Sequence, residues 1–130
     1  MRLKDRIAIV TGGGSGLGAG IARRFAEEGA SLVLADINGN NAETVASEIR
    51  EGQSKAIAVE MDVTDYDAAE ALVAQTVEEY GTVDILVNNA SAINLTGTVQ
   101  TSMKRYDLMH HINTRGTFLC SQRCIPHLLK

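Results

Sequence analysis

Tryptophan, proline and cysteine are nearly absent from this 130-residue chain. It has no tryptophan, a single proline at Pro126, and two cysteines, Cys120 and Cys124. The cysteines stand four residues apart, so a disulfide between them would tie one helical turn to itself, and no ligands at metal-binding spacing accompany them. We therefore expect two buried small side chains, no metal site and a reducing, cytoplasmic setting.

A surplus of positive charge and a long apolar run are also missing. Lys and Arg number 12 against 16 Asp and Glu, and the net charge is −4. A nucleic-acid surface needs clustered basic residues, which this chain does not have. No apolar stretch approaches the ~20 residues that span a bilayer, and the N-terminal segment lacks the apolar core of a signal peptide. We expect neither nucleic acid nor membrane as a partner.

Short apolar runs rich in β-branched residues alternate with helical patterns along the chain. The runs are Ile7–Val10, Ser31–Ala35, Ala56–Glu60 and Val83–Val87, and helices are predicted at about 17–29, 41–51, 66–80 and 102–125. Such alternation predicts right-handed βαβ crossovers, and nearly continuous apolar strands predict a parallel sheet covered on both faces. The predicted fold class is α/β: a Rossmann-type doubly wound parallel sheet of four strands in the order 3-2-1-4, with residues 1–130 forming one dinucleotide-binding domain.

Individual residues indicate where the predicted helices begin and end. The predicted stops are Gly29 and Gly81, and the predicted caps are Asn40 for the second helix, Asp65 for the third, and Thr101 or Ser102 for the fourth. Pro126 predicts a kink or stop near the end of the last helix. The apolar residues of that helix are expected in the core or in subunit packing: Met103, Leu108, Met109, Ile112, Phe118 and Leu119.

The most informative segment is residues 6–18, where an apolar strand stops at a glycine cluster that opens into a helix. This arrangement points backbone N–H groups and a positive helix end at a phosphate, and glycine lets a pyrophosphate approach the main chain. A plain strand-to-helix turn is the alternative. Asp36, which ends the second strand near the spacing of a ribose-binding acid, favours the nucleotide interpretation. No Gly-Lys-Ser/Thr follows the glycines, which argues against a phosphate-binding-loop NTPase.

Four motifs resemble those of the short-chain dehydrogenase/reductase family. They are the Thr-Gly-x-x-x-Gly-x-Gly turn at Thr11–Gly18, the Asp62–Val63 pair, Asn88–Ala90, and the Asn-x-x-Gly motif at Asn113–Gly116. Ser91 stands where the family usually has glycine. The segment 88–129 is most similar to the citronellol dehydrogenase and hydroxysteroid-dehydrogenase-like branches.

The resemblance implies hydride transfer between a nicotinamide cofactor and a small-molecule alcohol or carbonyl substrate, in a protein that is a homo-oligomer when full length. The cofactor-binding residues that it implies are Gly12, Ser15, Gly16, Leu17, Gly18, Asp36, Ile37, Asp62, Val63, Asn89 and Ala90. Asn113 matches the family's catalytic asparagine, which orders a water for proton relay. Two alternatives stay open: Asp62 as a cap of the following turn, and Asn113 as a structural hydrogen-bonding residue. The carboxylate of Asp36 would repel a 2′-phosphate, so NAD is expected over NADP.

The family's catalytic serine and its Tyr-x-x-x-Lys pair lie beyond the helix that carries Asn113, and residues 1–130 do not contain them. Tyrosines at 66, 80 and 106 are followed four residues later by Glu, Asp and His. We therefore expect the N-terminal, cofactor-binding portion of a longer NAD-dependent oxidoreductase, inactive alone. The alternative is a catalytically silent NAD-binding module. In either case the fourth strand would form an exposed sheet edge.

Overall fold

Four parallel strands form the central layer of the protein in a computed structural model that describes residues 1–130. They are β1 (Ile7–Thr11), β2 (Ser31–Asp36), β3 (Ala56–Glu60) and β4 (Ile85–Val87). Their order in the sheet is β3-β2-β1-β4, and every pairing is parallel. The predicted Rossmann-type sheet and its strand order are confirmed, and β4 is the edge strand beside β1.

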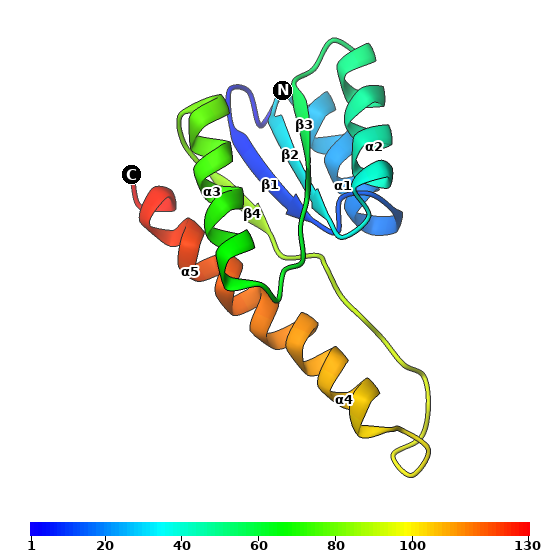
Figure 1. The fold of residues 1–130 in the computed structure, drawn as a ribbon. Helices are drawn as coiled ribbons and strands as arrows, with labels where there is room; N and C mark the ends of the chain where they lie inside the picture. Colours follow the sequence, from blue (N-terminus) through cyan, green and yellow to red (C-terminus); the bar gives the residue numbers. More distant parts are fainter.

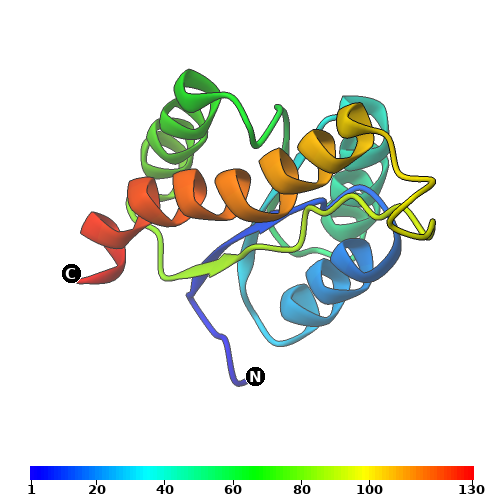
Figure 2. The same ribbon diagram turned by 90° about the horizontal axis from the view of Figure 1, so that it is seen from below.

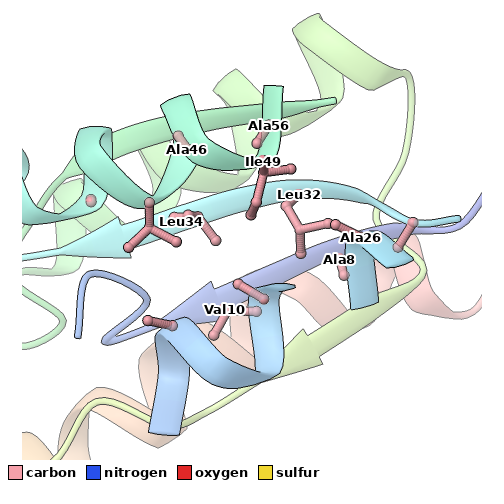
Figure 3. Close-up of a cluster of buried hydrophobic side chains, with 13 residues drawn as sticks. Ala8, Val10, Ala26, Leu32, Leu34, Ala46, Ile49 and Ala56 are labelled. Atoms are coloured by element: carbon pink, nitrogen blue, oxygen red, sulfur yellow. The ribbon is translucent and has the colours of Figure 1, made fainter. Parts of the chain in front are cut away.

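Helices cover both faces of this sheet (Figure 1). On one side lie α1 (Gly16–Glu27) and α2 (Gly39–Glu51), and on the other lie α3 (Tyr66–Tyr80) and α5 (Thr117–Leu128). Each face has its own buried apolar cluster, one against α1 and α2 and one against α3 and α5. Figure 3 shows the first cluster, in which alanines of the helices approach the larger side chains of β2.

The alternation of side chains along the strands supplies both clusters. In β1, Ala8 and Val10 belong to the α1–α2 cluster, whereas Ile9 belongs to the α3–α5 cluster. In β2, Leu34 and Val33 divide in the same way. Successive residues of a strand face opposite sides, so a sheet buried on both sides needs an apolar residue at every position. This explains why these strands have continuous apolar sequences.

Most of the predicted helix ends are confirmed. The Asp65 carboxylate accepts from two backbone N–H groups at the start of α3, Ser102 accepts from Arg105 N at the next helix, and Gly81 ends α3 at φ 89°. The cap predicted at Asn40 is wrong, because Asn38 caps α2 by accepting from the backbone N–H of residue 41 at 3.0 Å. Helix α2 starts at Gly39, earlier than predicted, because the hydrogen bond from Asn38 N to the Asp36 carboxylate closes the turn after β2 within two residues.

β4 also begins later than predicted, at Ile85 rather than Val83. The Asp84 carboxylate accepts a hydrogen bond from Ile7 N at 2.9 Å, and Asp84 N donates to Ile7 O at 2.9 Å. Arg6 lies 3.6 Å from the same carboxylate. The Asp84 side chain therefore takes the place of a backbone carbonyl as the acceptor for the first N–H of β1. In this way Asp84 fixes where β1 and β4 meet.

The helix predicted as one piece over 102–125 has three parts. These are α4 (Met103–His110), a π-helical segment η1 (His111–Gly116), and α5, which continues to Leu128. Pro126 does not stop the helix; it lies in its last turn, where only one hydrogen bond is lost. The π segment widens the helix where Asn113 faces the loop that follows β4.

α4 and the loop before it project beyond the sheet (Figures 1 and 2). None of the α4 residues is buried. Of the two environments expected for the apolar residues of this region, the core is confirmed for Leu119, whereas Met103 and Phe118, which are 68% and 63% exposed, lie outside the core and keep subunit packing as their predicted role. Cys120 and Cys124 are buried and unpaired, as expected, and burial raises the pKa of their thiols to about 11 and about 12.

Candidate functional site

A cavity of about 380 Å³ lies where the carboxyl ends of the four strands meet. Ligands of open α/β sheets bind at this edge, beside the point where the strand order reverses. The cavity is lined by Gly12, Ser15, Gly16, Leu17, Ala35, Asp36, Ile37, Met61, Asp62, Val63, Asn89, Ala90, Ser91 and Ile112. Every predicted cofactor residue except Gly18 is therefore in this lining, and Asn113 is next to it in sequence but outside it.

Backbone conformation or lack of space favours glycine at three positions of the turn after β1, which are Gly12, Gly16 and Gly18. Gly12 and Gly16 adopt φ values of 65° and 53°, in the left-handed region that favours glycine. A Cβ on Gly18 would lie 2.1 Å from the carbonyl oxygen of Gly12 and 2.6 Å from Nδ2 of Asn89. Gly18 thus lets α1 rest on the turn, which explains why it matters to the site without lining the cavity.

The N-terminus of α1 opens into the cavity without a cap. Its N-cap residue, Ser15, makes no side-chain capping hydrogen bond, and the first turn contains no acidic side chain. A helix start carries unpaired N–H groups and a partial positive charge. No side chain of the protein neutralises or caps this helix start, so a bound anion could accept hydrogen bonds from its N–H groups. Ser15, Gly16 and Leu17 all line the cavity next to it.

Thr11 joins the ends of β1 and β4. Its buried hydroxyl donates to Val87 O at 3.3 Å and accepts from the backbone N–H groups of Asn89 and Ala90 at 3.1 and 3.0 Å. The side chain of Asn89 in turn donates to Gly12 O at 3.3 Å. These bonds hold the segment after β4 against the glycine turn, so that both segments border one cavity.

The carboxylate of Asp36 lies at the end of β2 and is held by the main chain. One oxygen accepts from Gly14 N and the other from Asn38 N, both at 2.9 Å. These two bonds set the direction of the carboxylate at the cavity. Each oxygen retains a further lone pair that can accept from a hydroxyl group.

Asp62 closes a turn, which is the structural alternative that the sequence left open, and it also lines the cavity. Its carboxylate accepts from Thr64 N at 2.9 Å and from the Thr64 hydroxyl at 2.8 Å, which closes the turn before α3. It also lines the cavity, together with Val63. The capping bonds therefore position Asp62 at the site rather than remove it from the site.

Asn113 uses its side-chain amide to hold the loop that follows β4. Its Nδ2 donates to Ala92 O at 2.8 Å, and its Oδ1 accepts from Ala92 N at 2.9 Å. A second bond between the same segments runs from Asn88 Nδ2 to the hydroxyl of Ser121 at 3.0 Å. The structural alternative for Asn113 is thus present in the structure, with its partner just beyond the strand.

Some lining residues were missed by the sequence interpretation: Ala35, Met61, Ser91 and Ile112. Ala35 and Met61 immediately precede predicted residues at the carboxyl ends of β2 and β3, so their position at a strand end was a signal for them. Ser91 was noted only as a departure from the motif. Ile112 had no local signal, because it reaches the cavity only through the packing of η1.

Metal-ligand clusters, membrane-spanning helices and tyrosines at the cavity are all absent from the structure. No group of three or more His, Cys, Asp or Glu side chains could hold a metal ion, and no helix is both long enough and apolar enough to cross a membrane. None of the tyrosines lines the cavity. Tyr66 stacks under Arg123 and Tyr106 on His110, and burial together with the Glu79 charge raises the pKa of Tyr80.

Comparison with known proteins agrees with this geometry. A family model described as short chain dehydrogenase matches residues 6–130. The chain belongs to the short-chain dehydrogenase family. Within 94% of its length it is 48% identical to hydroxysteroid dehydrogenase-like protein 2 of Danio rerio, and within 99% it is 41% identical to the Homo sapiens protein of that name. Hydroxysteroid dehydrogenase-like proteins, one of the branches that segment 88–129 resembles, are thus among its relatives.

A solved structure of another member of the short-chain dehydrogenase family has the same fold as this chain. A variant of the Serratia marcescens short-chain dehydrogenase/reductase superposes on 98% of the chain with a TM-score of 0.92 and 36% identity. The chain covers 53% of that structure. It spans about a third of the curated relatives, 31% of the Danio rerio protein and 32% of the human one.

Proposed function

We propose that residues 1–130 are the N-terminal, cofactor-binding portion of an NAD-dependent oxidoreductase that acts on an alcohol or carbonyl substrate. The observation that carries this proposal is the uncapped start of α1 at the cavity, seated on a turn in which Gly18 has no space for a Cβ. An anion-binding helix start, a strand-end carboxylate and a partly apolar cavity are what a dinucleotide needs. The match of the short-chain dehydrogenase family over residues 6–130 supports it.

Different residues of the cavity would bind different parts of the dinucleotide. The start of α1 would receive the pyrophosphate, and Asp36 would accept hydrogen bonds from the adenosine ribose. Ile37 and Val63 supply apolar surface for the adenine, and Asn89 and Ala90 line the side of the cavity formed after β4. A bound nicotinamide cofactor would supply or take up the hydride; the protein would orient it and exclude water.

For Asn113 we propose a positioning role. Both ends of its side-chain amide bind the main chain of Ala92, so the residue sets where the loop after β4 runs beside the cavity. A water for proton relay, as the family resemblance implies, would depend on this fixed loop. Substrate contacts would then come from the same loop and from parts of the longer protein.

We propose NAD rather than NADP as the cofactor. The carboxylate of Asp36 is fixed by Gly14 N and Asn38 N, so it cannot easily turn away from a 2′-phosphate. No Lys or Arg is among the residues of the cavity lining. A lost charged hydrogen bond and the repulsion together favour NAD by about 1–2 kcal/mol, which is roughly tenfold in affinity.

Titration of residues 1–130 with NADH and NADPH, followed by nicotinamide fluorescence, tests this proposal. NADH is expected to bind about tenfold more tightly, and Asp36→Ala is expected to remove most of that difference. Glu51→Ala, which removes an exposed acid at the far end of α2, serves as the control and should leave the preference unchanged. An unchanged preference in Asp36→Ala would contradict the assignment of Asp36, and absence of NADH binding would contradict the proposed function.

A catalytically silent NAD-binding module is the second candidate. It is favoured by the positions of the tyrosines, none of which lines the cavity or has a lysine four residues later. In either case residues 1–130 would bind NAD without oxidising an alcohol. Sequence downstream of residue 130 distinguishes the two, because a serine and a Tyr-x-x-x-Lys pair there would identify the oxidoreductase.

We further propose a homo-oligomer in the longer protein, in the cytoplasm. Exposed apolar side chains of α4 and α5 are available for subunit packing: Met103, Leu108 and Phe118. The buried free thiols of Cys120 and Cys124 suit a reducing setting.

A further inference from the structure

Gly116 ends the π-helical segment η1 and is buried against the loop after β3. Its backbone is ordinary helix, with φ −61° and ψ −43°. Any residue can adopt this conformation, and alanine is a better helix former than glycine. The backbone therefore gives no reason for glycine at this position, and the reason must lie in what the helix touches.

The neighbour is Val63. A Cβ on residue 116 would lie 2.6 Å from Val63 Cγ2, 3.1 Å from Val63 Cβ and 3.4 Å from Val63 O. The first of these distances is shorter than any van der Waals contact between carbons. Val63 is only 8% exposed and belongs to the α3–α5 cluster, yet it also lines the cavity. It is thus a side chain that both contacts the helix at Gly116 and borders the proposed nucleotide site.

A methyl group at position 116 would have to displace either the helix or Val63. The helix is held in place by the Asn113–Ala92 pair of hydrogen bonds and by the bond between Asn88 and Ser121. Close-packed side chains surround Val63 on its core side, whereas the cavity is open space. Displacement would therefore move Val63 toward the cavity and narrow it.

We infer that Gly116 is a positioning residue for nucleotide binding: it acts through Val63 to set the width of the cavity between the loop after β3 and the final helix. The inference rests on the proposed function, because it assigns the cavity to a dinucleotide. It adds a residue that lies outside the cavity lining, and it gives the final helix a second role beside holding the loop after β4.

The test is a set of variants of residues 1–130 titrated with NADH, and with ADP-ribose by competition. Gly116→Ala is expected to weaken the binding of both by about five- to tenfold, since both carry the adenosine that the Val63 side of the cavity would accept. In a Val63→Ala background the same change should cost less than about twofold, because the methyl group that it would strike is gone. This rescue separates positioning from a general loss of stability, which Val63→Ala would make worse.

Gly20→Ala is the matched control. Gly20 is an exposed glycine inside α1 whose Cβ would meet nothing within 4 Å. Its replacement should leave the affinity for NADH unchanged. If Gly116→Ala does not fold, Val63→Ile, which crowds the same contact from the loop, is expected to weaken NADH binding in its place.

Three outcomes would overturn the inference. Wild-type affinity in Gly116→Ala, or in Val63→Ile where that variant replaces it, would show that the contact does not affect the cavity. An equal loss of affinity in the Val63→Ala background would show that Val63 does not transmit the effect. Failure of the unaltered chain to bind NADH would remove the proposed function and this inference together, which distinguishes it from the other two.

Discussion

The hydroxyl oxygen of Thr11 connects the end of β1 to the segment that lines the cavity after β4. Its hydroxyl serves three main-chain groups, two of them N–H donors of the segment that lines the cavity after β4. A buried donor that loses its partner costs about 1–3 kcal/mol, because water cannot replace the lost bond. A single side chain thus determines whether the ends of β1 and β4 stay together.

Thr11→Val keeps the shape of the side chain and removes the hydroxyl. It is expected to lower the free energy of unfolding by about 2–4 kcal/mol, since the N–H groups of Asn89 and Ala90 both lose their acceptor. Urea denaturation followed by circular dichroism measures this change. Thr11→Ser, which keeps the hydroxyl, should lose less than half as much, and an equal loss in both variants would mean that the methyl group matters more than the bonds.

Sequence patterns located those residues of the cavity that stand at or just after the ends of strands, and their binding roles stay predictions. The glycines of the first turn, Asp36 and the pair Asn89–Ala90 follow directly from strand ends, and a strand end can be recognised in the sequence. The position of Ile112 at the cavity could not be found in this way, and Gly116 was known only as the last residue of the Asn-x-x-Gly motif, without its contact. Ile112 reaches the cavity, and Gly116 reaches Val63, only because a distant helix packs there, and no local pattern records that contact.

At the level of elements, the helical region from α4 through η1 to α5 also has a feature that the sequence did not predict. Apolar spacing predicted one helix over 102–125, and the structure has a π-helical segment in its middle. A π turn is less stable than an α turn in isolation, so it needs a tertiary contact to compensate. Here the compensating contact is the pairing of Asn113 with Ala92, a residue of a loop 21 positions earlier in the chain.

Asn113→Ala should release that loop. Its amide donates to Ala92 O and accepts from Ala92 N, and alanine can do neither. We expect the Ala92 amide to exchange with solvent deuterium at least about tenfold faster, as local opening becomes easier. Asn94→Ala, which removes only a bond to the Thr96 hydroxyl within the same loop, is the control. Unchanged exchange at Ala92 in Asn113→Ala would show that other contacts hold the loop.

At the scale of the whole molecule, the buried thiols link stability to pH. Burial raises the pKa of Cys120 from 9.0 to about 11 and that of Cys124 to about 12, the latter helped by its neighbour's charge. Below pH 9 both states keep the thiol protons and the thiols have no effect on the pH dependence. Above it the unfolded chain releases them while the folded chain retains them, so stability falls as pH rises, by up to ~1.4 kcal/mol per pH unit for each thiol.

Urea midpoints measured from pH 8 to pH 11 test this dependence. The unaltered chain should lose stability above pH 9 more steeply than a Cys120→Ala/Cys124→Ala variant, whose other groups titrate in the same way. The alanine variant is expected to be less stable at pH 8, because it leaves small cavities, but its curve should be flatter. Parallel curves would show that the thiols do not titrate differently in the two states.

The uncovered side of β4 is the other property that belongs to the whole molecule. β4 is hydrogen-bonded to β1 on one side only, and its residues Ile85–Val87 are apolar and half-buried. A free strand edge of this kind pairs readily with another chain, so residues 1–130 are expected to associate at micromolar concentration, with the infrared signature of intermolecular β pairing. Size-exclusion chromatography with light scattering measures the mass.

Exposed apolar side chains on the projecting loop are a second source of association, and Leu95→Ser/Val99→Ser removes two of them, which are 89% and 92% exposed. Association should persist in that variant, because the edge is intact; a monomer would assign it to the loop, and a monomeric unaltered chain would show that the edge is protected.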